Sequence, residues 1–160
     1  MSVYRTPLPN EVKSILASHE TWQRTGGEAG RCADFSGMDL RGHNFYKKDL
    51  SNVQFNNCNL ESVDMRDCCC YFTSFKNANL YNVSFSFSRF VSTNFFNADI
   101  TFASFRGAKI MCDFFVYECY VGEDGDRKTF FDRSCANELM YENLRNGVFS
   151  YVKEAQLLKD

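Results

Sequence analysis

Residues 32–60 read CADFSGMDLRGHNFYKKDLSNVQFNNCNL, and from Phe35 onward every fifth residue of this stretch is large and apolar. An α-helix repeats its apolar residues about every 3.6 positions and a half-buried strand about every 2, so a period of five fits neither element. The period continues without insertion through 16 consecutive centres, of which only Cys70 is small. A short, fixed period of this kind predicts a solenoid. The centres are Phe35, Leu40, Phe45, Leu50, Phe55, Leu60, Met65, Cys70, Phe75, Leu80, Phe85, Phe90, Phe95, Ile100, Phe105 and Ile110.

The residue two positions before each centre is also selective, being small or β-branched in most units. Residues two apart in an extended segment point to the same side, so we expect this residue and the centre to point inward together. The second residue after the centre is Gly or Asn in eight of the sixteen units. Gly and Asn tolerate the positive φ that a type II turn requires there. Each unit is therefore predicted to be a short strand followed by a corner. The small inward residues are Ala33, Val53, Cys58, Val63, Cys68, Thr73, Ala78, Val83, Ser88, Thr93, Ala98, Ala103 and Ala108.

The identity of the centres indicates how many units close one coil. Phe stands mostly at odd units and Leu or Ile at even ones, which gives a second period of ten residues. This alternation stays in register only if each coil has an even number of sides. Four sides of five residues fit, so residues 20 apart should stack. The predicted columns include Phe35, Phe55, Phe75 and Phe95 on one side, and Leu40, Leu60, Leu80 and Ile100 on another.

The stretches ADFSGMDLRGHNF and NANLYNVSF match the pattern A-(D/N)-L-x-x, and in this respect the chain resembles the pentapeptide-repeat proteins over residues 33–112. The preceding stretch is similar to the lead-in of many family members, although Cys32 is inserted before its last matching residue. The resemblance implies an all-β solenoid, a right-handed quadrilateral β-helix of about four coils. The matching lead-in residues are His19, Trp22, Gly26, Gly27, Gly30, Arg31 and Ala33.

Irregular residues mark the ends of the solenoid. Met38, His43 and Lys48 occupy the small inward position in the first coil, and charged residues take it after residue 112. We expect His43 and Lys48 to lie at the open first end, under an N-terminal cap. The predicted division is a capping helix and lead-in at 1–32, the β-helix at 33–112, and an irregular coil followed by a helical segment at 113–160.

Both flanking segments carry apolar residues at helical spacing. In residues 8–20 these are Val12, Ile15, Leu16 and His19, and Asn10 is a plausible N-cap. Residues 135–147 and 148–159 are predicted to form two helices. The second carries an apolar stripe, which either caps the last coil or meets its copy in a homodimer. The stripe consists of Val148, Tyr151, Val152, Ala155 and Leu158.

Composition gives little sign of chemistry. The chain has a net charge of −2, eight Cys without zinc-ligand spacing, and two His. It carries no phosphate loop, nucleophile elbow or HExxH motif. We therefore expect reduced, structural cysteines and a non-enzymatic protein without catalytic residues, cofactor or metal. A signal-peptide core and a long apolar span are both absent from the sequence, so we expect a cytoplasmic protein that does not associate with membranes.

Stacking at 20 residues gathers apolar side chains on one corner of the predicted coil. The candidate interaction edge consists of Tyr71, Phe72, Val91 and Met111. Either the C-terminal segment folds over this edge or a protein partner binds it, because contiguous apolar patches mark contacts. Other outward aromatics are more scattered: Tyr46, Tyr81, Phe87, Phe96 and Phe102.

The favoured function is a non-enzymatic protein–protein interaction module, an adaptor or inhibitor of a protein target. The alternative, which the family resemblance implies, is a DNA-mimic modulator of DNA gyrase or topoisomerase, similar to the quinolone-resistance pentapeptide proteins. Residues 33–112 carry eight basic and seven acidic residues, whereas a mimic should be distinctly negative. Four coils also rise only roughly 19 Å, about six base pairs. Direct binding of nucleic acid is not expected.

Overall fold

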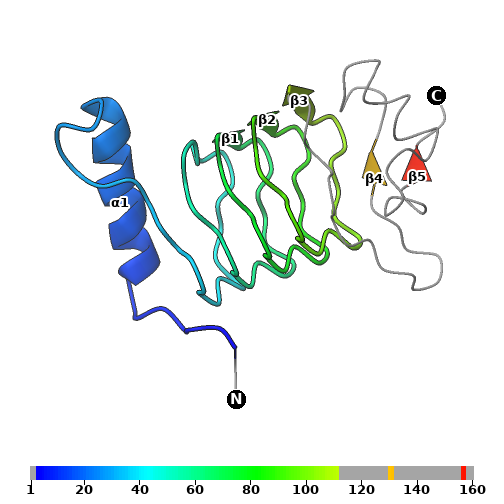
Figure 1. The fold of residues 1–160 in the computed structure, drawn as a ribbon, viewed down its shortest axis with the longest axis horizontal. Coiled ribbons are helices and arrows are strands. Elements are labelled where there is room, and N and C mark those ends of the chain that lie inside the picture. The colour runs from blue at the N-terminus through cyan, green and yellow to red at the C-terminus, as the bar shows by residue number, and fades with distance from the viewer. Residues whose placement is uncertain (1–2, 112–129, 132–155, 158–160) are drawn as a thin grey trace.

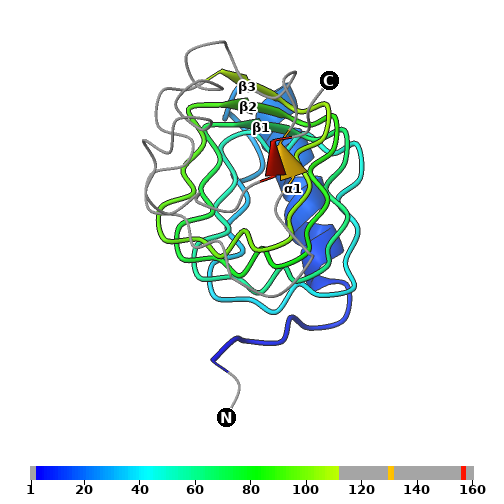
Figure 2. The same cartoon turned by 90° about the vertical axis from the view of Figure 1, so that its right-hand side faces the viewer.

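The computed structural model describes residues 3–111, 130–131 and 156–157. One helix, α1 (Glu11–Arg24), precedes a coiled region that carries three short strands on successive turns, β1 (Cys69–Tyr71), β2 (Arg89–Val91) and β3 (Lys109–Met111). Two further strands, β4 (Phe130–Phe131) and β5 (Gln156–Leu157), lie beyond β3 (Figure 1). Viewed along the coil, successive turns superpose and α1 crosses behind them (Figure 2).

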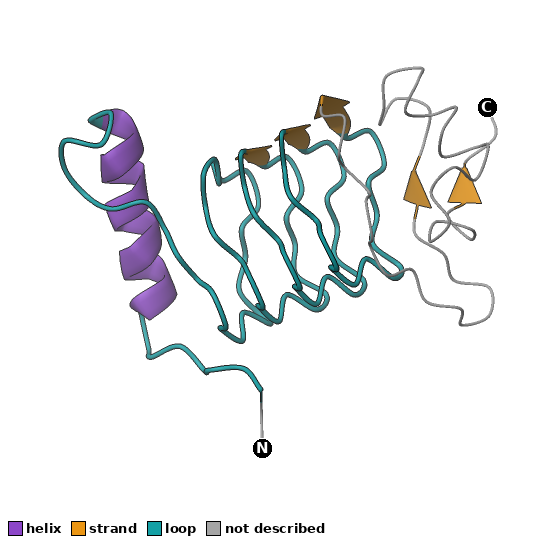
Figure 3. Ribbon diagram, in the orientation of Figure 1, coloured by secondary structure: helices purple, strands orange, loops and turns teal. Residues whose placement is uncertain are grey.

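Backbone pairing sets the pitch of the coil. Strands β1, β2 and β3 form one parallel sheet, in which Cys70 pairs with Phe90 and Phe90 with Ile110. On the other sides the contacts are single parallel bridges, such as those of Ser74 with Gln54 and Asn94, so Figure 3 draws most of the coil as loop. These partners are 20 residues apart, and each turn therefore takes four five-residue units. The stacking that the Phe and Leu alternation predicts is observed.

The repeat centres fill the interior of the coil. Phe35, Phe55, Phe75 and Phe95 are at most 1% exposed. Their rings stack in a column, with centroids 5.2 Å apart between Phe55 and Phe75 and 5.0 Å between Phe75 and Phe95. Phe75 also meets Phe85 of a neighbouring column edge-on, at 5.5 Å. These contacts make the core a continuous stack of aromatic side chains. Burial of each Phe contributes roughly 1.5–3 kcal/mol to the stability of the fold. All thirteen small inward residues predicted from the sequence are buried as well.

The corners adopt one conformation regardless of sequence. The second residue after the centre has a positive φ in every unit from Gly37 to Gly107. Seven of these fifteen residues are neither Gly nor Asn, and Phe72 (57°) and Phe87 (64°) are among them. Most corners also close a turn by a hydrogen bond, such as that from Ala78 N–H to the Phe75 carbonyl at 3.0 Å. The predicted turn is confirmed, and it extends to residues for which a positive φ is unfavourable.

Helix α1 lies across the N-terminal end of the coil (Figure 1), where Val12 and His19 are buried against it. Asn10 is the N-cap residue, as predicted, and its carbonyl accepts the Ser14 N–H at 2.9 Å, but its φ is 67° and its side chain makes no capping hydrogen bond. The carboxylate of Glu11 instead holds the segment that precedes the helix. It accepts the Leu8 N–H at 2.7 Å and pairs with Arg5 at 2.9 Å.

The C-terminal segment departs from the sequence-based prediction at the residues that can be compared. Strands β4 and β5 pair in parallel, with Phe130 opposite Gln156 and Phe131 opposite Leu157. Residues 156 and 157 fall within the second predicted helix, so the helix is wrong at these two positions. The predicted stripe lies outside the described residues: Val148, Tyr151, Val152, Ala155 and Leu158. In the part of the chain that the structure describes, no helix is long and apolar enough to cross a bilayer.

Candidate functional site

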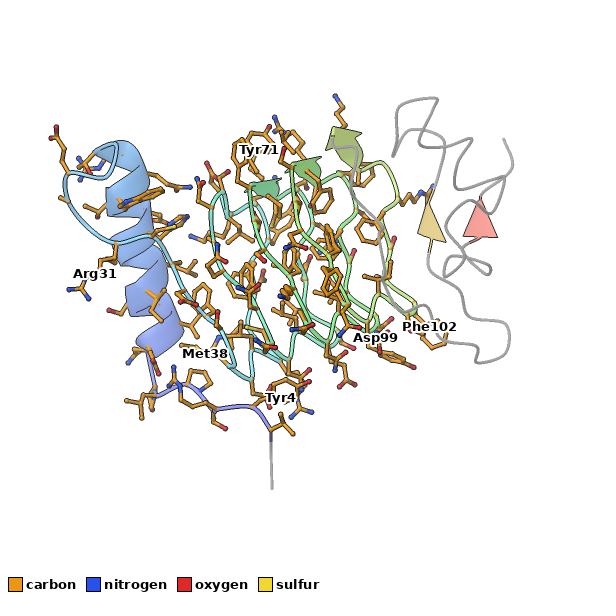
Figure 4. The ribbon with its side chains drawn as sticks, in the orientation of Figure 1. Tyr4, Arg31, Met38, Tyr71, Asp99 and Phe102 are labelled. Carbon is orange, nitrogen blue, oxygen red and sulfur yellow. The ribbon has the colours of Figure 1, made fainter. Side chains whose placement is uncertain are left out.

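The candidate interaction edge follows the outer ends of β1, β2 and β3. Backbone pairing places Tyr71 opposite Val91, and Val91 opposite Met111, so the four residues lie along one corner as expected. Tyr71 and Val91 are half-buried, whereas Phe72 is 59% exposed. Figure 4 shows Tyr71 beside the three strands, on the opposite side of the coil from Asp99. The stacked strands β1 and β2 thus present the apolar side chains of Tyr71 and Val91 in register, with Phe72 beside them.

Phe72 is held outward by its backbone. Its N–H donates to the Val91 carbonyl at 2.8 Å, and its φ of 57° lies in the left-handed region. Asn52 and Ser92, in the same column, have similar φ values of 68° and 48°. The ladder therefore imposes this conformation on an aromatic residue that does not favour it. Such strain is retained only where surrounding structure fixes it, and it is common at binding sites.

Cationic side chains flank the edge. On the outer side of the sheet, Cys69 pairs with Arg89 and Arg89 with Lys109, and both cations are exposed. At the corner before β2, Phe87 is 59% exposed and its ring covers Gly107 so closely that an added Cβ would lie 2.5 Å from it. The sequence-based prediction places Phe87 among the scattered outward aromatics and does not include the two cations. The 20-residue register, applied to the position before each centre, would have found Arg89 and Lys109.

One predicted outward aromatic is buried. Phe102 is only 8% exposed, and its ring meets Tyr81 edge-on with the centroids 5.0 Å apart. The two residues stand on neighbouring turns of one corner, so they cover each other. This pair is a local surface contact rather than a part of the candidate edge.

The N-terminal end holds the two His residues. His19 is fully buried, and its Nδ1 accepts the Ala33 N–H at 3.2 Å. Burial lowers the pKa of His19, and the nearby charges of Asp49 and Glu20 act in the opposite direction. His19 also stacks on Trp22, with ring centroids 5.8 Å apart. A neutral imidazole that ties the lead-in to α1 has a structural role.

His43 and Lys48 lie beside α1, at the N-terminal end of the coil, as their irregular residue types at the small inward position predict. Together with Val12 and Leu16 they line a hollow of about 340 Å³ between the helix and the first coil. Lys48 Nζ pairs with Glu20 at 2.9 Å across this hollow. The basic side chain at the inward position is thus satisfied by the helix above it.

The three buried cysteines, Cys58, Cys68 and Cys70, are poor nucleophiles. Burial raises the pKa of Cys58 and of Cys68 to about 12, and it also raises the pKa of Cys70. The thiols of Cys58 and Cys68 donate to the carbonyls of Phe35 and Phe45, at 2.8 and 3.0 Å. These thiols stay protonated at neutral pH and serve as small hydrogen-bonding core residues. Within the described ranges, no group of three or more His, Cys, Asp and Glu side chains could hold a metal ion.

Comparison with known proteins addresses the fold. A family model described as pentapeptide repeats matches in eight copies, over residues 31–67 and 73–110. A solved pentapeptide repeat protein from Nostoc Pcc 7120 is similar at 14% identity and a TM-score of 0.51, over 86% of this chain and 91% of that one. QnrB1, a plasmid-mediated fluoroquinolone resistance protein, is similar at 13% identity and a TM-score of 0.42, over 79% and 75%. No curated protein matches. At these identities the first likeness concerns the fold alone, a right-handed quadrilateral β-helix.

Proposed function

Because the chain belongs to the pentapeptide-repeat family, we propose that it is a non-enzymatic protein–protein interaction module, an adaptor or an inhibitor. It binds a protein partner through the edge formed by Tyr71, Phe72, Val91 and Met111. The observation that carries this proposal is Phe72, an aromatic side chain 59% exposed on a backbone of positive φ.

The rigidity of the coil supports a binding role. Association is opposed by the entropy of ordering side chains and loops at the interface. Here the ladder already fixes the backbone of the edge, through contacts such as Phe72 N–H to the Val91 carbonyl. Aromatic side chains on a preformed surface are typical of binding hot spots. A partner would therefore meet an ordered apolar line.

The interior and the thiols support a non-enzymatic role. Stacked Phe and Leu side chains fill the coil, and the buried thiols have pKa values too high for nucleophilic chemistry. The alternative of gyrase mimicry requires an evenly acidic surface. Asp39, Glu61 and Asp99 instead occupy a different side from Arg89 and Lys109. A gyrase supercoiling assay with and without quinolone tests this alternative, and an effect at micromolar protein would support it.

Partner capture with matched variants tests the proposal. The edge variant is Tyr71→Ser/Phe72→Asn, and the control is Phe96→Asn, which removes an aromatic 43% exposed at another corner. Each protein is immobilised after circular dichroism has shown that it is folded, and retained proteins are identified by mass spectrometry. We expect a partner that the wild type and the control retain and the edge variant loses. An edge variant that keeps every partner would exclude this edge.

A further inference from the structure

The charged residues of the coil separate onto two sides. Acidic residues at one corner, including Glu61 and Asp99, face away from the candidate edge, as the labels of Asp99 and Tyr71 in Figure 4 show. The outer side of β1–β3 and the corner before it carry five basic residues against two acidic ones. These basic residues are Lys47, Arg66, Arg89, Arg106 and Lys109, and the acidic ones are Asp49 and Asp67.

Four of these cations form no ion pair among the described residues, and one of the four, Lys47, lies over the ring of Tyr46. Arg66 is paired with Asp64 at 2.7 Å, and on the other side Arg41 is paired with Asp39 at 2.7 Å. Arg89, Arg106 and Lys109 are exposed and form no ion pair within the described part of the chain. Arg89 and Lys109 are moreover direct partners on neighbouring strands, about 4.8 Å apart, where like charges are unfavourable. This arrangement does not help the isolated fold, and it attracts an anionic ligand.

Exposed aromatic side chains stand on either side of the cations. Phe87 lies two residues before β2 and Phe72 directly follows β1, so the row of Arg89 and Lys109 runs between the two corners. Both Phe residues are 59% exposed and both have a positive φ. Cationic and apolar contact points thus alternate across one short surface.

We propose that this surface, the basic–aromatic face of Phe72, Phe87, Arg89, Arg106 and Lys109, binds an acidic peptide segment of a protein partner. Carboxylates of the segment lie against the three cations, and its apolar side chains lie against the two Phe rings. The inference rests on the proposed function and gives the chemistry of the partner at the same region. Charged contacts of this kind set specificity and association rate, while the aromatic contacts hold the complex.

The extent of the face favours a peptide over a nucleic acid. Asp49 continues the column of Arg89 and Lys109 toward the N-terminal end, and Asp67 lies in the column of Phe87. Both carboxylates would repel the evenly charged backbone of a longer strand. Single-stranded nucleic acid needs a continuous basic groove several nucleotides long. A short acidic motif needs only the cations that this face supplies.

Fluorescence anisotropy tests the proposal with defined probes. The first is a labelled ten-residue peptide of Asp and Glu interrupted by two Phe, the second is its amide counterpart with Asn and Gln, and the third is an oligothymidine of similar length. The test variant is Arg89→Gln/Lys109→Gln. The control, Arg41→Gln/Lys76→Gln, removes the same charge from other sides of the coil. Comparison of the wild type, the test variant and the control with each of the three probes separates local contacts from net charge.

We expect the acidic peptide to bind the wild type and the control equally, and the test variant at least about tenfold more weakly. Binding should weaken from about 20 to about 200 mM salt, and the amide peptide should bind poorly. Equal binding by the test variant, no binding of the acidic peptide, or tighter binding of oligothymidine would each overturn the proposal. The proposed function fails separately, if partner capture is unaffected by Tyr71→Ser/Phe72→Asn.

Discussion

Replacing Phe72 with Asn should stabilise the protein, although it removes an aromatic side chain. Phe72 has a φ of 57°, a conformation that Asn adopts far more readily than Phe. An equivalent corner shows what Asn would gain. There Asn77 Nδ2 donates to Asn57 Oδ1 at 3.0 Å, one turn below. The residue one turn below position 72 is Asn52, which has the same backbone conformation as Asn57.

The magnitude follows from three opposing contributions. The left-handed conformation costs an ordinary residue roughly 1–2 kcal/mol, most of which Asn avoids. A hydrogen bond with Asn52 adds about 0.5–1 kcal/mol. Because Phe72 is 59% exposed, its partial burial contributes only about 1 kcal/mol, which the substitution loses. The free energy of unfolding should therefore rise by about 0.5–1 kcal/mol, and Tm by about 1–3 °C.

Urea and thermal unfolding measure this change, and Phe96→Asn is its matched control. Phe96 is 43% exposed at the first position of its corner, where φ is not positive, and Lys76 Nζ lies 5.5 Å from its ring centroid. The control loses burial and the cation–π contact without relief of strain, so it should lower stability by about 1–2 kcal/mol. If both substitutions destabilise equally, positive φ at Phe72 stores no strain. If the proposed function is correct, the stabilised variant should also bind its partner less well.

Three further predictions concern the core and the N-terminal end. Ser88→Ala should lower the free energy of unfolding by about 1–3 kcal/mol, because the Ser88 hydroxyl donates to the Met65 carbonyl at 2.7 Å and accepts the Cys68 N–H at 3.0 Å. Urea unfolding measures this loss, and a negligible loss would contradict the prediction. Phe75→Ala should cost about 3–5 kcal/mol in the same assay, and a loss below about 1 kcal/mol would argue against a continuous aromatic column. Burial holds the pKa of His19 below its ordinary value of 6.5, so stability should be full above that pH and fall as the pH drops from 6.5 toward the lowered pKa. The urea midpoint of His19→Gln should lack this loss, whereas that of His43→Gln should retain it.

The sequence predicts the repeating part of this fold well because every unit solves the same packing problem. Phe75 and its predecessor two positions earlier, Thr73, both point inward and both are fully buried. The small inward position also accommodates hydrogen-bonding side chains, which the sequence pattern alone did not indicate. Thr73 Oγ1 donates to the Leu50 carbonyl at 2.8 Å, 23 residues earlier in the chain. The 20-residue register predicts which residues stack. It does not predict the hydrogen bond of the Thr73 hydroxyl, because the Leu50 carbonyl comes within reach only when the coil is closed.

Predictions at the ends of the coil were less successful because no repeat constrains them. Asn10 is the N-cap of α1 as predicted, but it lacks the side-chain hydrogen bond typical of that position, and the contacts of Glu11 with Leu8 and Arg5 were not predicted. The apolar spacing around Gln156 predicts a helix, but Gln156 and Leu157 form a strand that pairs with β4, since tertiary contacts override local propensity. For the candidate site, the apolar edge followed from stacking alone. The cations beside it were not predicted, because a single exposed Arg or Lys is ordinary and only the pairing of Arg89 with Lys109 on neighbouring strands is informative.

The inward residues of each repeat unit carry stability, whereas the proposed recognition uses its outward residues. The centre and the small residue before it face the core, so substitutions there change the free energy of unfolding by several kcal/mol. The corner backbone is fixed by the ladder whatever side chain it carries, as the positive φ of Lys47, Phe72 and Phe87 shows. Outward positions are thus free to vary at a cost of about 1 kcal/mol each, which the core can offset. Exposed Phe at two strained corners beside Arg89 and Lys109 departs from what the fold favours, and this departure supports the proposed binding role.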